Sequence, residues 1–249
     1  MGGQVAISHQ VVPAQTNTAL YVQLHQAGHP TGDLLRVQAA YRLAARLFNG
    51  RYRKTERAFL CHAVGAASSV AHFERDPDFI LAAMLHAAYD SGQFPDGRFG
   101  KASAAHRALV RSVVGERAES LIFRYPLLDF DTGAPERLAA AGLPAGIEDV
   151  LFLALAHEID DLADLGLAIA PKYGASIAAR IEACALLARR IGREPLARAL
   201  EAQASLYADT AWVAALQSER TRGFRIAPNA GAYLRLRRAR RDDGAVEIF

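Results

Sequence analysis

The sequence has little cysteine, little lysine and no long hydrophobic run. Its two cysteines, Cys61 and Cys184, lie far apart and form no C-x-x-C pair, which excludes a disulfide framework and a cysteine zinc site and indicates a reducing compartment. The longest uncharged apolar run, residues 150–156, is too short for a membrane span, and the first residues lack the basic and apolar regions of a signal peptide. We therefore expect a cytoplasmic protein without a membrane partner.

The basic residues are almost all arginine. Among the 29 of them only Lys54, Lys101 and Lys172 are lysines, a bias that suits a GC-rich bacterial coding sequence. Much of the net charge of +3 comes from the arginine run at residues 235–241. Because no aromatic residues are interleaved with it and no nucleic-acid-binding motif is present, this run indicates a solvated helix end, and we predict no nucleic-acid partner.

The composition and the periodicity indicate a helical globular protein. The 249 residues are 51% hydrophobic and 22% charged, enough apolar surface for a proper core. Apolar residues recur at helical spacing along most of the chain, and strict alternation is nearly absent, which predicts an all-α fold. The expected helices span residues 33–48, 54–72, 77–90, 102–114, 116–125, 148–165, 176–191 and 194–216.

These helices suggest three parts. We expect an N-terminal segment at residues 1–30, a helical core at 31–170 and a C-terminal helical extension at 171–249 that packs on the core. The last two helices form an antiparallel pair that either completes the monomer core or serves a homo-oligomer interface. The glycines and prolines of residues 91–101 predict a loop directly after the third helix, a placement typical of functional loops.

Three histidines, His62, His86 and His157, lie inside apolar helical stretches, where a polar ring needs a partner or a ligand. His86 and Asp90 are four residues apart, as are His157 and Asp161, so each pair is expected to share a helix face. If these faces meet, imidazoles and carboxylates converge on a metal site that manganese, iron, cobalt or zinc would accept. The alternative, in which each histidine is a hydrogen-bonded core residue, stays open.

Two motifs carry a family resemblance. CHAVGAA contains His62, and AAMLHAAYDSG contains His86, 24 positions later; an apolar helix with the polar patch HEIDD follows at residues 157–161. This combination resembles the HD-domain superfamily, and the spacing of the first two motifs is similar to that in the hydrolase domain of RelA/SpoT-type alarmone enzymes. The LHxxY pattern with Phe94 shortly after it resembles more closely an uncharacterised HD-like family of bacterial and fungal proteins. The resemblance covers about residues 53–166.

The resemblance implies an HD-like helical bundle and a set of site residues. It implies His62, His86, His157 and Asp161 as metal ligands, His86 and Asp90 as an acid–base pair, and Arg53 as a contact for the substrate. Two positions depart from the superfamily pattern: Ala87 replaces its eponymous aspartate, and His157 stands close to the position of its closing aspartate ligand. The residues that are left could hold one metal ion, or none.

We therefore expect a divergent HD-domain enzyme that binds one divalent metal and hydrolyses a phosphate ester of a small molecule. An iron-dependent oxygenase on the same fold is one alternative. A metal-free binding or regulatory protein is another, and the Ala87 substitution is its best evidence. Two further histidines, His72 and His106, are expected at the surface, and Tyr89 and Phe94 flank the loop at the expected pocket mouth.

Overall fold

The computed structural model describes residues 10–130, 133–165, 168–208, 214–217 and 222–226, and the arginine run at residues 235–241 lies outside them. Within the described residues the fold is all-α, as predicted, apart from two strands of two residues that pair antiparallel. The elements are α1 (Asn17–Gln26), α2 (Thr31–Leu47), β1 (Arg51–Tyr52), α3 (Phe59–Ala71), α4 (Pro77–Leu85), α5 (Ala88–Ser91), α6 (Ala104–Val114), α7 (Glu116–Arg124), the 3₁₀ helix η1 (Tyr125–Leu128), α8 (Ala134–Ala141), α9 (Glu148–Ala163), α10 (Pro171–Arg190), α11 (Glu194–Ala208), the 3₁₀ helix η3 (Ala214–Leu216) and β2 (Phe224–Arg225).

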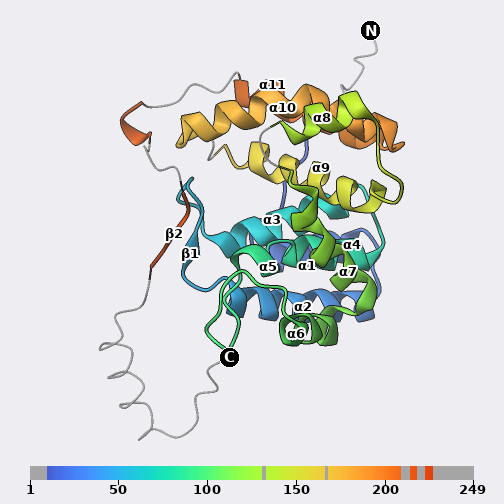
Figure 1. Ribbon diagram of the computed structural model, residues 1–249, viewed down its shortest axis with the longest axis vertical. Coiled ribbons are helices and arrows are strands. Elements are labelled where there is room, and N and C mark those ends of the chain that lie inside the picture. The colour runs from blue at the N-terminus through green and yellow to red at the C-terminus, as the bar shows by residue number, and fades with distance from the viewer. Residues whose placement is uncertain (1–9, 131–132, 166–167, 209–213, 218–221, 227–249) are drawn as a thin grey trace, which may run out of the picture.

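The helices form layers with α9 in the middle (Figure 1). On one side of α9 lie α10, α11 and α8, and on the other side α3 and α4. The pair α2 and α6 closes the far end. Helices α3, α4 and α9 are apolar around most of their circumference and are buried accordingly, because a helix without a polar face is stable only inside a core. This central position means that polar groups in the middle of these helices, such as His62 on α3 and Asp160 on α9, point into the protein.

The expected helix at residues 54–72 begins later, at Phe59. The residues before it form a turn in which Tyr52 bridges to Ala58 and Glu56 takes a positive φ of 65°. The amide of Arg53 donates to the carbonyl of Arg57 across this turn, at 2.9 Å. Both arginine side chains form ion pairs with carboxylates of α9, so tertiary contacts decide the conformation of this segment.

The expected helix at residues 77–90 is broken at His86. Helix α4 ends at Leu85 and the short α5 begins at Ala88. The carbonyl of Ala83 accepts from both the backbone amide of His86, at 3.4 Å, and its ring Nδ1, at 2.8 Å, so a side chain takes part in the hydrogen bonding that would continue the helix. His86 and Asp90 therefore do not lie on one continuous helix as predicted, although both line the same cavity.

The first helix and the last two long helices pack into the same core. In the expected N-terminal segment, α1 buries Leu20 and Leu24 completely. Helix α10 begins at Pro171, before the expected residue 176. Helix α11 ends at Ala208, and residues 209–213 lie outside the described ranges. The last residues of the expected helix at 194–216 form the 3₁₀ helix η3. Buried side chains of both helices, such as Ile177 and Leu200, belong to the one hydrophobic cluster, so the two helices complete the monomer core.

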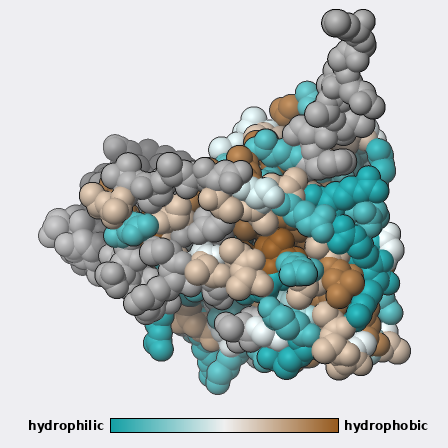
Figure 2. All heavy atoms as spheres, turned by 90° about the horizontal axis from the view of Figure 1, so that it is seen from above, coloured by the Kyte–Doolittle hydropathy of each residue, from teal (hydrophilic) through white to brown (hydrophobic). Residues whose placement is uncertain are grey.

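The outer face of α10 and α11 mixes hydrophilic and hydrophobic side chains (Figure 2). Exposed apolar side chains on these helices include Leu186 and Leu206, 42% and 37% exposed. Single exposed residues of this kind are ordinary on a monomer surface and do not define an interface. Among the described helices, none combines the length and the apolar character that a membrane span needs.

Candidate metal centre

Three imidazole rings meet inside the bundle, as the sequence predicted. His62 comes from α3, His86 from the break between α4 and α5, and His157 from α9. The ring centroids are 4.7 Å apart for His62 and His157, 4.8 Å for His86 and His157, and 5.2 Å for His62 and His86. One nitrogen from each ring lies within 4.8 Å of the other two. The break at His86 thus directs a polar ring toward two rings from other helices.

A hydrogen-bond partner fixes the tautomer of one of these rings. The carbonyl oxygen of Ala83 can only accept, so His86 carries its proton on Nδ1, at 2.8 Å from that oxygen. A neutral imidazole has only one proton, so Nε2 of His86 carries a lone pair, the form that binds a metal. In His62, Nδ1 lies 2.8 Å from Oδ2 of Asp160, an acceptor, and 2.9 Å from a terminal nitrogen of Arg53, a donor, so these contacts are compatible with either tautomer.

The geometry of this cluster fits a metal ion. The Nε2 atoms of His62 and His157 are 3.0 Å apart, and two nitrogens that each bind one ion at about 2.0–2.1 Å with an angle near 90° have about this separation. The second nitrogen of His157, Nδ1, is buried without a hydrogen-bond partner among the described residues, and Oε1 of Glu158 lies 3.7 Å from it. In the tautomer of His157 that carries its proton on Nδ1, the carboxylate of Glu158 would be the nearest acceptor for that proton, and Nε2 would be available to bind a metal.

Burial keeps two of the rings neutral. Burial lowers the pKa of His86 to about 3, with the neighbouring His157 adding to the effect. Burial also lowers the pKa of His62 well below its ordinary value, and the positive charge of Arg53 acts in the same direction. Neutral imidazoles are available as ligands at any pH near neutrality, because protons do not compete for their lone pairs.

A charged cluster occupies the opposite side of the His62 ring. Arg57 donates to both carboxylate oxygens of Asp160, at 2.7 and 2.9 Å. Arg53 binds Asp161 through both of its terminal nitrogens, one of them at 2.9 Å. All four side chains are nearly or completely buried, and their formal charges cancel. Burial by itself would raise the pKa of Asp161, but Arg53 outweighs it and holds that pKa well below its usual range.

This arrangement separates Asp161 from the expected ligand set. Its carboxylate lies 3.6 Å from Nδ1 of His62, the nitrogen that faces away from His157. Two groups of ligating side chains result, namely His62 with His86 and His157, and His62 with Asp160 and Asp161. Because both terminal nitrogens of Arg53 bind Asp161, its carboxylate does not belong to the three-histidine cluster. It lies at the Nδ1 side of His62 and helps to orient that ring.

Gly65 allows the charged cluster to lie against α3. It stands one turn after His62, and a Cβ atom built on it would lie 1.7 Å from Oδ1 of Asp160 and 2.7 Å from a terminal nitrogen of Arg57. Glycine in a helix costs about 1 kcal/mol relative to alanine. Here the missing side chain lets a buried ion pair approach the helix closely enough for Asp160 to reach the ring of His62.

A cavity of about 540 Å³ opens onto the three imidazoles. Ala87 and Asp90 line it from the α4–α5 side, and Arg53 and Lys54 from the turn before α3. Burial and the charge of Arg53 lower the pKa of Lys54. The remaining walls are partly aromatic: the lining also includes Phe59, Ser91, Tyr125, Pro126, Asp129 and Phe130. The cavity therefore joins a nitrogen-rich floor to walls with both cationic and acidic groups.

Several predictions about single residues need correction. His106 was expected at the surface, but it is only 4% exposed, and its ring stacks on Phe94 with centroids 3.8 Å apart. Tyr89 and Phe94 are buried and do not line the central cavity. The hydroxyl of Tyr89 donates to Glu119 at 2.8 Å. These aromatic residues hold the loop after α5 against the core, which is their structural role.

Sequence reasoning missed Arg57, Gly65 and Lys54. Arg57 follows Arg53 by four positions, and the two carboxylates at 160 and 161 offer a matching pair of opposite charges. The sequence therefore offered one signal for Arg57, namely that two arginines and two carboxylates are available to form two ion pairs. Nothing local to Gly65 indicated its role, because the ion pair that it accommodates comes from the turn before its own helix and from α9.

Residues 44–129 match the model of a family described as a domain of unknown function, DUF6817. This segment contains Arg53, His62, His86 and Asp90, and it ends before α9, which supplies His157. No curated protein matches the chain.

Proposed function

We propose that this protein is a divergent HD-domain enzyme that binds one divalent metal ion through His62, His86 and His157 and hydrolyses a phosphate ester of a small molecule. The observation that supports it is the convergence of three ring nitrogens at the floor of a 540 Å³ cavity. A divalent ion held by these ligands supplies Lewis acidity and lowers the pKa of water that it binds. Manganese, cobalt, zinc and iron all accept imidazole nitrogen.

The residues around the cavity have distinct roles in this proposal. Asp160 and Arg53 hold Nδ1 of His62, at 2.8 and 2.9 Å, so that Nε2 faces His157. Lys54 lines one wall and supplies positive charge for a phosphate group, beside Arg53, whose own charge is paired with Asp161. Asp90, on the other side of the cavity, is positioned to take a proton from the attacking water. Ala87 leaves open the space that a longer side chain would fill.

A second candidate is an iron-dependent oxygenase on the same scaffold. The observation that favours it is that the three cavity-facing donors are neutral nitrogens and that no carboxylate of the described residues belongs to this cluster. Iron content together with oxygen consumption would support this candidate. Manganese, cobalt or zinc together with phosphate release would support the hydrolase.

The proposal keeps a cytoplasmic location and a small-molecule substrate. Both cysteines are free in the structure, as expected for a reducing compartment. A homo-oligomer is compatible with the exposed face of α10 and α11, and it is not required for the metal site, because all three histidines come from one chain.

Metal analysis of the protein purified without a histidine tag tests the proposal. We expect about one divalent ion per chain, and a drop in melting temperature when a chelator removes it, because a ligand that binds only the folded state stabilises it. Single replacements of His62, His86 or His157 by alanine should each lower metal retention by 10-fold or more, as expected on loss of one of three ligands.

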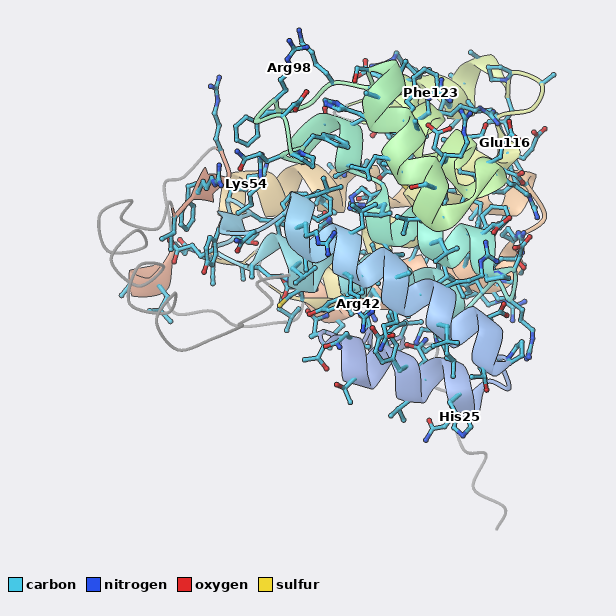
Figure 3. All side chains as sticks on the ribbon, turned by 90° about the horizontal axis from the view of Figure 1, so that it is seen from below. His25, Arg42, Lys54, Arg98, Glu116 and Phe123 are labelled. Carbon is cyan, nitrogen blue, oxygen red and sulfur yellow. The ribbon has the colours of Figure 1, made fainter. Side chains whose placement is uncertain are left out.

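The matched control is His25→Ala. His25 lies on α1 and is exposed (Figure 3), it belongs neither to the three-histidine cluster nor to the cavity lining, and its replacement should leave metal content unchanged. The proposal would be contradicted if the protein bound no metal and melted at the same temperature with and without chelator. That result would support the third hypothesis, a metal-free binding or regulatory protein.

A further inference from the structure

A second cavity, of about 290 Å³, lies beside the loop that follows α5. Its apolar lining comes from α2, α6 and this loop, and includes Leu43, Leu47, Phe94, Pro95 and Leu109. Its polar lining consists of two arginines and two amides, namely Arg46, Arg225, Asn49 and Gln93. No residue lines both this cavity and the central one. It is therefore a separate site, formed by elements that carry no histidine ligand.

The charge of this second cavity has one sign. Within the part of the chain that the structure describes, no carboxylate forms an ion pair with Arg46 or Arg225, and no aspartate or glutamate lines the cavity. Both arginine side chains are exposed at its rim. By contrast, the arginines around the central site are bound to carboxylates at close range. Two guanidinium groups that share a rim without a counter-charge attract an anion.

A third arginine extends this positive region. The guanidinium groups of Arg51 and Arg225 both lie over the ring of Phe99, at 5.7 and 5.5 Å from its centroid. Burial and the charge of Arg225 lower the pKa of Arg51, while Asp90 acts in the opposite direction. That carboxylate lines the central cavity and not this one. Among the described residues, Asp90 offsets part of the charge of Arg51, while no carboxylate lines the second cavity beside Arg46 and Arg225.

We propose that this second cavity binds a small amphipathic anion, whose apolar part lies against Leu47 and Phe94 and whose carboxylate or phosphate group is held by Arg46 and Arg225. Leu47 and Phe94 are 1% and 2% exposed, so the floor is a fixed part of the core, as in preformed ligand pockets. The volume lies at the lower end of the range for ligand pockets, about 300–1,000 Å³, which limits the ligand to a short chain or a single ring. Asn49 and Gln93 offer further hydrogen bonds to its polar end.

The test uses three probes with the same apolar chain, namely hexanoate, hexyl phosphate and 1-hexanol. Isothermal titration of the wild-type protein should show binding of at least one of the two anions with a Kd below about 1 mM, and at least 10-fold weaker binding of the uncharged alcohol. The stronger of the two anions identifies the head group, and either result supports the site.

Two variants and one control locate the binding. Arg46→Gln and Arg225→Gln should each weaken binding of the preferred anion by at least 5-fold. Arg42→Gln removes the same charge one turn earlier on α2 from an exposed residue beside α1 (Figure 3), and should leave the affinity unchanged. None of these substitutions should change metal content, so this test is independent of the metal site.

Three results would overturn the proposal. One is the absence of binding by both anions below about 1 mM. Another is equal affinity for 1-hexanol, since the arginines would then have no role. The last is the same loss of affinity in Arg42→Gln as in Arg46→Gln, which would indicate attraction by the general charge of the surface. Unchanged melting temperatures of the variants verify that each comparison concerns a folded protein.

Discussion

The two edges of the His62 ring face very different surroundings. At Nδ1, two arginines and two aspartates bind one another, with every charge matched by an opposite one. At Nε2, the ring faces two other imidazoles across distances of 4.7 and 5.2 Å between centroids, and no opposite charge lies among them. Polar groups that satisfy one another stabilise and orient a site. The Nε2 atoms of His62 and His157 lie 3.0 Å apart, so they either share a proton or, in the proposed metal centre, bind one cation.

The largest expected effect comes from removing one carboxylate of the charged cluster at Nδ1 of His62. Asp160→Leu removes the carboxylate that binds both terminal nitrogens of the buried Arg57 guanidinium, which then has Asp164, at 3.5 Å, as its nearest counter-charge, and should cost about 3–5 kcal/mol of the free energy of unfolding. Urea denaturation measures this loss. Because Arg57→Met removes this buried charge, the double variant should be more stable than Asp160→Leu alone.

The control for this comparison is an exposed ion pair. Glu201 binds Arg189 at the surface, with its side chain 49% exposed, and Glu201→Leu should cost less than about 1 kcal/mol. If Asp160→Leu cost no more than Glu201→Leu, the buried cluster would not stabilise the fold in the way described.

The burial of a neutral histidine ring should affect how the stability of the protein depends on pH. In the metal-free protein His86 stays neutral down to a pKa of about 3, whereas in the unfolded chain it binds a proton near pH 6.5. The unfolded state therefore binds more protons below pH 6.5, and the free energy of unfolding falls as the pH falls, by up to about 1.4 kcal/mol per pH unit for this residue. Stability is fully retained above pH 6.5.

Replacing the ring should remove this part of the slope. Between pH 6.5 and pH 5, wild-type protein in the presence of chelator should lose about 2 kcal/mol more than His86→Gln, measured by denaturation at each pH. The exposed His25→Gln serves as the control and should keep the wild-type slope. Parallel curves for wild type and His86→Gln would show that the ring is not held neutral.

The smallest effect concerns the contact between the two sides. Gly65→Ala introduces a Cβ atom at 1.7 Å from Oδ1 of Asp160, and should cost about 1–2 kcal/mol in spite of the higher helix propensity of alanine. The matched control is Gly32→Ala in the first turn of α2, where a Cβ atom meets nothing within 4 Å. That variant should be neutral or slightly more stable. A stabilising Gly65→Ala would mean that Asp160 does not need this close approach. Thermal denaturation measures both variants.

Much of the fold could be predicted from the periodicity of the sequence. The helices at α2, α6, α7 and α9 begin and end within a few residues of the expected positions, because an apolar face at a period of 3.6 is a local signal. The prediction failed at the start of α3 and at His86. In both places a side chain forms a tertiary or local hydrogen bond that outweighs helix propensity, and periodicity carries no information about such bonds.

The sequence by itself indicated that His62, His86 and His157 lie in apolar helical stretches, where a polar ring needs a partner or a ligand. It also determined that the chain would be helical. Only the tertiary structure decided how the rings of His62 and His86 are oriented, since this depends on the contacts of Asp160 and Arg53 with His62 and on the carbonyl of Ala83. The tertiary structure also decided that Asp161 pairs with Arg53 at the Nδ1 side of His62. These choices come from contacts between residues that are distant in sequence, or from a break in one helix, and a pattern read along the chain contains neither.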